Sequence, residues 1–171
     1  QQNLVTQIEQ TKEEITYLNE VLSSLSITEN ERDISEIREE LYQTGYVKRD
    51  SSVKNKKRPA ASEPLKFISS DGFHIKAGKN NTQNDRITIK ESSKSDLWFH
   101  VKDHPGSHVV ISTVGNEAPE RTIFEAATIA ATYSKAALSG KTAVDYTNIK
   151  NVKKPSGSKP GMVIYDNYNT L

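Results

Sequence analysis

Residues 96–111, DLWFHVKDHPGSHVVI, hold most of the side chains in this sequence that could do chemistry. The stretch contains the chain's one tryptophan and three of its four histidines, His100, His104 and His108. Histidines four residues apart align on one face of a helix, where they can bind zinc. A Pro-Gly pair interrupts this stretch, however, and its flanks are typical of strands. The helical spacing therefore does not predict a metal site.

A nucleophile with a neighbouring base is the second chemistry to consider. Ser107 and His108 are adjacent in a predicted strand, so their side chains point to opposite faces and cannot form a catalytic dyad. The absence of cysteine excludes thiol catalysis and disulfide bonds. No acidic residue is evident that would orient a histidine as a base. We therefore expect no catalytic residue, no metal and no cofactor, and a protein that is not an enzyme.

Three clusters of hydrogen-bond donors are better suited to bind a polyanion such as RNA. KNVKKPSGSKPG (150–161) sets lysines around glycines and prolines, GKNN (78–81) adds amides and an ammonium group, and the histidine-rich stretch supplies the third. Trp98 and Phe99 alternate, so one packs in the core, and the other can stack on an unpaired base if it is exposed. The simpler alternative is that these loop lysines are only solvated. The candidate nucleic-acid-binding residues are Lys79, Asn80, Asn81, Arg86, Trp98, His100, Lys102, His104, Ser107, His108, Lys153, Lys154 and Lys159.

Charge divides the chain into two parts. Residues 1–50 carry five Lys/Arg and eleven Asp/Glu, a net charge of −6, and the other residues carry 18 and 11, a net charge of +7. An acidic arm joined to a basic domain predicts different partners for the two parts.

The acidic part has the pattern of a coiled-coil helix. Its seam is spaced alternately by four and three residues and consists of Leu4, Ile8, Thr11, Ile15, Leu18, Leu22 and Leu25. A second, shorter helix follows, with Thr28 and Glu31 as a predicted capping box and Gly45 as its stop. This helix is too short to cover the seam. The seam therefore predicts a partner from a missing part of the same chain or from a second copy, unless the two helices only pack together. Because Gln1 falls within the helical pattern, we interpret the chain as part of a longer protein.

The organisation predicted from these patterns is a helical coiled-coil arm at 1–47, a linker at 48–64 and a small domain at 65–171. The run KNKKR (54–58) within the linker could bind phosphates or simply be solvated. In the domain we expect a hairpin around Asp71-Gly72, a short helix capped by Asn81 or Thr82 and reaching Lys90, and a main helix from Pro119 to Leu138. Strands are expected at LWFHV, SHVVISTV, TAVDYTNIKNV and GMVIYD. The fold class is α+β: the helical arm and a mixed α/β domain of five or six strands with one long helix.

Several ordered segments resemble a known family. They are SSDGFHIKAGKNNTQND, SDLWFHVKDHPGSHVVI, EAATIAATYSKAALSG, VDYTNIKNVKKPSGSKPGMVIY and the terminal NTL. Together they are similar to the NFACT-R domain of the RqcH/NEMF family, whose Gram-positive members are also called fibronectin-binding protein A-like. EIREELYQTGYVK resembles the returning arm and base of that family's middle coiled coil. The family typically has arginine where this chain has Lys79, a change that keeps the charge and loses bidentate phosphate contact.

The resemblance implies a role in ribosome-associated quality control. Family members bind the obstructed large ribosomal subunit and recruit charged tRNA, alanyl-tRNA in bacteria, to extend stalled chains without a template. The implied partners are tRNA and large-subunit ribosomal RNA. Because the domains that contribute to tRNA handling are absent from this sequence, we do not expect it to perform tailing alone.

The same resemblance implies a second function of another class. Streptococcal and related members are described as surface adhesins that bind host fibronectin, so fibronectin is the alternative partner. The sequence has neither a secretory signal nor an apolar run of the roughly 20 residues that span a bilayer. We therefore expect a cytoplasmic protein, and the resemblance also allows a surface location without a signal peptide.

Overall fold

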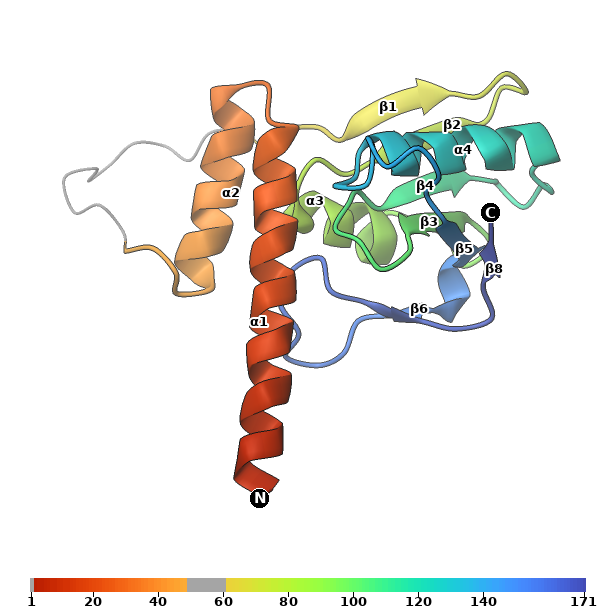
Figure 1. Cartoon of the computed structure of the whole chain (residues 1–171). Helices are drawn as coiled ribbons and strands as arrows, with labels where there is room; N and C mark the ends of the chain where they lie inside the picture. The colour runs from red at the N-terminus through yellow and green to blue at the C-terminus, as the bar shows by residue number, and fades with distance from the viewer. Residues whose placement is uncertain (1, 49–60) are drawn as a thin grey trace.

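A computed structural model describes residues 2–48 and 61–171 of the chain (Figure 1). Two antiparallel helices, α1 (Gln2–Ser26) and α2 (Glu31–Gln43), form the arm, and α1 extends well beyond the body of the domain. Asn30 rather than Thr28 caps α2, because its side chain accepts from the N–H groups of Arg32 and Asp33. Gly45 follows the helix in the left-handed conformation (φ 85°), as the sequence predicts.

The domain is built on a six-stranded antiparallel sheet with the order β1-β2-β4-β3-β5-β8. Its strands are β1 (Leu65–Ile68), β2 (His74–Ala77), β3 (Leu97–Val101), β4 (Val109–Ser112), β5 (Val144–Asn148) and β8 (Asn169–Thr170). A separate ribbon pairs β6 (Val152–Lys153) with β7 (Ile164–Tyr165). The predicted hairpin is present: Gly72 has a φ of 85° and its N–H donates to the Ser69 carbonyl at 2.9 Å. The α+β class is therefore confirmed.

The sheet is covered on both faces. Helix α4 (Glu120–Thr132) packs on one face, against Phe99 and its neighbours, and helix α3 (Asn81–Asp85), the π-helical turn η1 (Arg86–Lys90) and the β6–β7 ribbon are associated with the other. Trp98 belongs to the cluster that Ile87 and Val152 form on this second face. Side chains alternate along a strand, so Trp98 and Phe99 point to opposite faces and both are fully buried. Base stacking would require one of these rings to be exposed, and neither is.

Helix α4 is shorter than its sequence predicts, ending at Thr132 instead of Leu138. The backbone beyond it bonds to the β3–β4 turn: Ser107 N–H donates to the Tyr133 carbonyl and Lys135 N–H to the Pro105 carbonyl, both at 2.9 Å. A Cβ on Gly106 would lie 2.9 Å from the Ser134 Cβ. The small residue is therefore needed for this close approach, which competes with helix continuation.

Two further details differ from the sequence prediction. The expected strand 142–152 is interrupted by the 3-10 turn η2 (Ile149–Asn151), so β5 and β6 belong to different sheets. Helix α3 is capped by Asn80, whose side chain accepts from the Gln83 N–H, and not by Asn81 or Thr82. The basic run 54–58 lies outside the described residues. The division into arm, linker and domain stays a prediction.

Candidate nucleic-acid interface

The predicted donor cluster at 78–81 lies against the acidic arm. Lys79 Nζ is 2.6 Å from Asp33 Oδ1, and the two side chains are 11% and 2% exposed. Asn80 Nδ2 donates to Glu36 Oε2 at 2.8 Å, and Asn81 Nδ2 donates to Glu40 Oε1 at 3.0 Å. One carboxylate of α2 therefore meets each of the three donor side chains. We call this contact between α2 and residues 79–83 the joint.

The end of the predicted linker contacts the joint. Ser62 donates from its N–H and its hydroxyl to the Glu36 carboxylate, at 2.6 and 2.9 Å. Gln83 Nε2 donates to both Glu36 and Ser62, at 2.8 and 2.7 Å. The Arg86 guanidinium contacts the Ser62 carbonyl at 3.3 Å and Glu91 at 3.1 Å. Arg86 is thus held by protein acceptors, like the donors at 79–81.

Burial and hydrogen bonding have opposite effects on the pKa values of the carboxyl groups in the joint. Burial raises the pKa of Glu40, against hydrogen bonds from Asn81 and Tyr17 that lower it. Burial also acts to raise the pKa of Asp33, but the hydrogen bond and charge of Lys79 outweigh it and leave this pKa below its usual range. The ammonium group of Lys79 is therefore already paired with a charge inside the molecule.

Two of the three lysines predicted in the basic loop are also bound within the protein. Lys154 Nζ lies 2.8 Å from the Asp85 carboxylate and donates to the Lys159 carbonyl at 2.9 Å. Lys159 Nζ lies 4.8 and 4.7 Å from the ring centres of Tyr17 and Tyr46 and bonds to the Tyr46 hydroxyl. These are cation–π contacts with the arm. Lys153, in contrast, is 65% exposed, with only an open ion pair to the half-exposed Asp166 at 3.5 Å.

The predicted residues of the histidine-rich hairpin also fall into a buried group and an accessible group. The strands pair as the Pro-Gly turn predicts, and the rings of His100 and His108 meet edge to face at 5.4 Å on the Trp98 side of the sheet. Burial lowers the pKa of His100 to about 4 and that of His108 well below its usual range. Both rings are therefore uncharged at neutral pH. Ser107 is buried and donates to the Gly78 carbonyl at 2.6 Å.

The other two predicted residues of the hairpin remain accessible. Lys102 is 38% exposed, 3.9 Å from Asp145 Oδ1 and 5.4 Å from the Tyr168 ring centre. His104 is exposed at the turn. Within the described residues, no three His, Asp or Glu side chains are grouped so that they could hold a metal ion.

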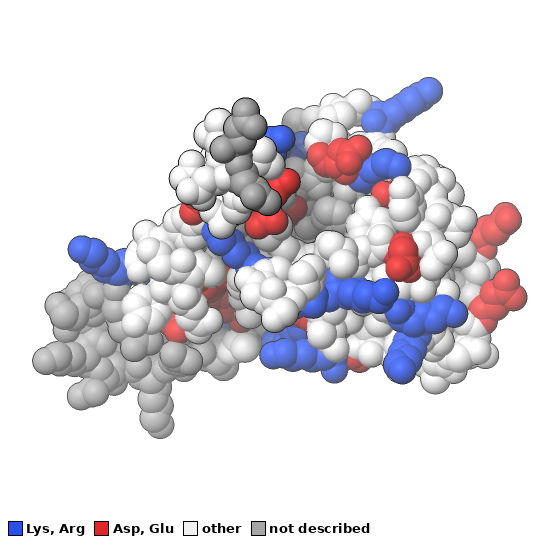
Figure 2. Space-filling view, turned by 90° about the horizontal axis from the view of Figure 1, so that it is seen from below, with Lys and Arg blue, Asp and Glu red and all other residues white. Residues whose placement is uncertain are grey.

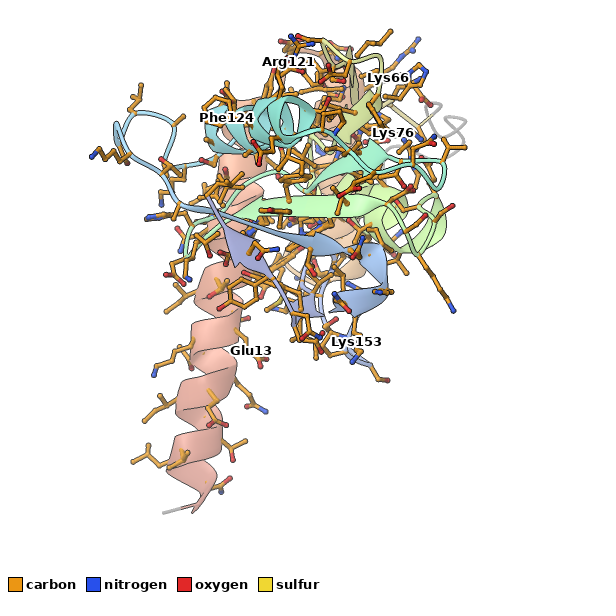
Figure 3. The ribbon with its side chains drawn as sticks, turned by 90° about the vertical axis from the view of Figure 1, so that its right-hand side faces the viewer. Glu13, Lys66, Lys76, Arg121, Phe124 and Lys153 are labelled. Atoms are coloured by element: carbon orange, nitrogen blue, oxygen red, sulfur yellow. The ribbon has the colours of Figure 1, made fainter. Side chains whose placement is uncertain are left out.

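A second set of lysines forms the surface that is free to meet a polyanion. Figure 2 shows Lys and Arg side chains gathered over the underside of the domain, and Figure 3 places Lys153 there, at the opposite end of the domain from Lys66. Lys150 N–H donates to the Lys94 carbonyl at 3.2 Å, which sets these two lysines side by side. We define the lysine face as Lys90, Lys94, Lys150 and Lys153, all exposed. Among the described residues, no carboxylate pairs with the first three.

Sequence reasoning missed Lys90 and Lys94. Each is a single lysine near the end of a helical turn or in a short loop, with no basic neighbour in sequence. Only the fold brings Lys94 beside Lys150, which lies far along the sequence. A local charge pattern contains no signal that could have identified them.

These features define a class of protein: an antiparallel α+β domain with a basic face, joined to a helical arm. A sequence profile of the NFACT protein RNA binding domain matches residues 64–167, and one of the NFACT N-terminal and middle domains matches residues 1–60. The chain belongs to the NFACT RNA-binding-domain family, and the predicted resemblance to RqcH and NEMF proteins is confirmed.

Its similarity to particular members extends over nearly the whole chain. It is 46% identical over 167 residues to the Rqc2 homolog RqcH of Bacillus subtilis and 44% identical over 173 residues to that of Streptococcus suis. These alignments cover 96% and 99% of this chain and 29% and 30% of the relatives, so the chain spans under a third of their length. The C-terminal part of the fibronectin/fibrinogen-binding protein from Streptococcus suis superposes with a TM-score of 0.91 at 42% identity, covering 99% of this chain and 67% of that one.

Proposed function

We propose that this chain is the RNA-binding end of a ribosome-associated quality control factor, and that it binds RNA through the lysine face. The observation that carries the proposal is the gathering of Lys and Arg side chains on the underside of a domain that belongs to an RNA-binding family (Figure 2). Unpaired ammonium groups on a rigid surface bind phosphates and release counterions. The role is binding and not catalysis.

The particular RNAs that we propose are tRNA and the RNA of an obstructed large ribosomal subunit. The whole protein would support alanine tailing of stalled chains, with this chain holding the RNA. The ribosomal part of this proposal is supported by the similarity to proteins named ribosome quality control complex subunit NEMF, in mouse and human. The proposed site of action is therefore the cytoplasm. Within the described residues, no helix is both long and apolar enough to cross a membrane.

The salt dependence of RNA binding tests this proposal. We expect the triple variant Lys90→Ala, Lys94→Ala, Lys150→Ala to flatten the slope of log K against log salt by about 2 to 3 units, because three phosphate contacts are lost. The matched control replaces three other exposed lysines, Lys48, Lys66 and Lys141, and should keep the parent slope. Equal slopes for both variants, with both folded, would contradict the proposed surface.

A second candidate function is fibronectin binding. Its support is the extensive similarity to the streptococcal fibronectin/fibrinogen-binding fragment. An interface with a protein, formed through apolar contacts or strand addition, should be less sensitive to salt than phosphate binding. Binding of immobilised fibronectin that survives high salt and the lysine triple variant would favour this function. Both functions can reside in one protein.

A further inference from the structure

A pocket of about 740 Å³ lies where α1 meets the domain, apart from the lysine face. Four segments line it: residues 16–20 of α1, the β3–β4 hairpin, residues 135–139 after α4, and residues 161–165 at and beyond the end of the basic loop. Its volume is within the usual range of small-molecule sites. None of the proposed contacts of the lysine face uses this pocket, so its lining is open to another role.

The lining of the pocket is mixed, with apolar side chains and a larger number of polar ones. Val101, Pro105, Ala136, Met162 and Val163 supply the apolar surface. The polar groups are mainly acceptors. Glu20 Oε2 accepts from the Gly106 N–H at 3.1 Å, and Asn19 Oδ1 accepts from Lys135 Nζ at 3.1 Å.

One donor in the lining has no partner. Trp98 is fully buried, and its indole Nε1 forms no hydrogen bond with any described residue. A buried donor without a partner is rare and costs free energy. The rings of His100 and Tyr165 pack on the indole, with 5.8 and 4.8 Å between ring centres, and do not bond to this nitrogen.

The charges of the lining argue against a phosphate in the pocket itself. Among the described residues that line it, Lys135 is the only lysine and none is an arginine; Lys135 bonds to Asn19, and Asp103 is acidic. Burial keeps the imidazoles of His100 and His108 uncharged, and it raises the pKa of Glu20 to about 8. The ligand that fits is therefore a neutral, flat molecule with apolar faces and both donors and acceptors on its edge. A nucleobase has this chemistry.

We propose that this pocket binds a single unpaired nucleobase from an RNA strand whose phosphates lie on the lysine face. This inference rests on the proposed RNA binding. The two sites are joined by one segment, since the chain that carries Lys153 continues through residues 161–163 into the pocket wall. Extruded bases of single strands are commonly held in such pockets, while the backbone meets cations outside. Because α1 forms one wall, the base also contacts the arm.

The single tryptophan makes the test direct, since all indole fluorescence of the chain comes from Trp98. The probes are the four ribonucleoside monophosphates, with ribose 5-phosphate as the matched base-free control. We expect saturable quenching by at least one nucleotide, at a concentration at least about tenfold below any effect of ribose 5-phosphate, after correction for absorption by the base. Quenching by base and sugar alike, or by neither, would overturn the pocket.

A variant that narrows the pocket provides the second measurement. Thr16 is exposed on α1 and lines the pocket, so Thr16→Phe reduces the space without changing the core. It should weaken nucleotide quenching about tenfold or more, whereas Gln7→Phe on the same helix should not. Undiminished quenching in folded Thr16→Phe would also reject the pocket.

The two proposals fail separately. An RNA oligonucleotide and its abasic counterpart that bind equally tightly, with a salt slope still sensitive to the lysine triple variant, reject the nucleobase site and leave RNA binding intact. Loss of all salt-dependent RNA binding rejects the proposed function, whatever the mononucleotides do.

Discussion

The two faces of the helical arm differ in how the rest of the chain uses them. On one face, Tyr17 and Val21 are buried with Ile37 of α2, next to the polar joint. On the other, most of the heptad seam is exposed, with Leu4 at 62%, Ile15 at 55% and Leu22 at 60%. The regular apolar pattern thus lies outside the fold, and the irregular, largely polar face forms its interior contact.

This difference shows what each face requires. The joint is satisfied within the chain, since its carboxylates and amides bond to one another. Leu18 of the seam packs against the Tyr17 cluster, whereas Leu4, Ile8, Ile15, Leu22 and Leu25 are exposed. Exposed apolar rows of this kind indicate an interaction site. Pairing of the seam with a missing part of the same chain or with a second copy stays a prediction.

The largest effect on stability should come from removing the ring of Tyr17, which lies in the apolar cluster next to the joint. Tyr17 is fully buried, donates to Glu40 at 2.9 Å and stacks on Tyr46 at 5.6 Å. Tyr17→Ala should lower the free energy of unfolding by about 3 to 5 kcal/mol, as other buried aromatic truncations do. Ile15→Ala, on the seam, should change it by less than about 0.5 kcal/mol. Urea unfolding measures both, and similar losses would remove the contrast between the faces.

A slightly smaller effect is expected from the ion pair of the joint. Lys79→Ala leaves the carboxylate of Asp33 buried without its cation, which should cost about 3 kcal/mol. Lys79→Arg keeps the charge and should retain most of the stability. If Lys79 instead serves RNA, Lys79→Ala will change the salt slope of RNA binding and leave the unfolding midpoint in place.

The carboxyl group of Glu20 makes the arm sensitive to pH. Its pKa is about 8, against 4.5 in an unfolded chain, because burial disfavours the charged form. Between these values the folded state holds a proton that the unfolded state has lost, so this group lowers stability as pH rises. Below about pH 6.5 the lowered pKa values of His100 and His108 act in the opposite direction, so the decline should be seen between about pH 7 and 8. One linked proton gives at most about 1.4 kcal/mol per pH unit.

The matched variant for this pH effect is Glu20→Gln, which should flatten the decline. Some slope will remain, because burial also raises the pKa of Glu40 and acts in the same direction. Thermal melts across this pH range measure the effect. A parent protein whose stability rises over the range would contradict the assignment to Glu20.

The smallest effect on stability should come from charges on the seam. Ile8 is 47% exposed, so the double variant Leu4→Glu, Ile8→Glu should leave the unfolding free energy within about 0.5 kcal/mol. It should, however, abolish any self-association, which about three heptads can support only weakly. Sedimentation at rising concentration compares it with the parent. A parent that is monomeric throughout would leave the missing part of the chain as the seam's proposed partner.

Patterns with a local physical cause could be read from the sequence. The period of α1, the Gly45 stop, the Asp71-Gly72 hairpin and the pairing across Pro105-Gly106 all depend on residues within a few positions of each other. The α+β class and the family resemblance could also be predicted from the sequence. Helix α4 was predicted too long because its end depends on a distant turn, whose backbone accepts and donates the bonds that another helical turn would use.

The tertiary structure decided which polar side chains are free. In sequence, Lys79, Lys154 and Lys153 are equivalent loop lysines, but the fold places Asp33 against the first and Asp85 against the second and leaves the third exposed. Lys94 comes to lie beside Lys150 only in the folded chain. A lysine's type and neighbours in sequence fix its charge, whereas the carboxylate that neutralises it can come from any part of the chain. Burial and ion pairing depend on contacts between residues far apart in sequence, and only the folded chain determines them.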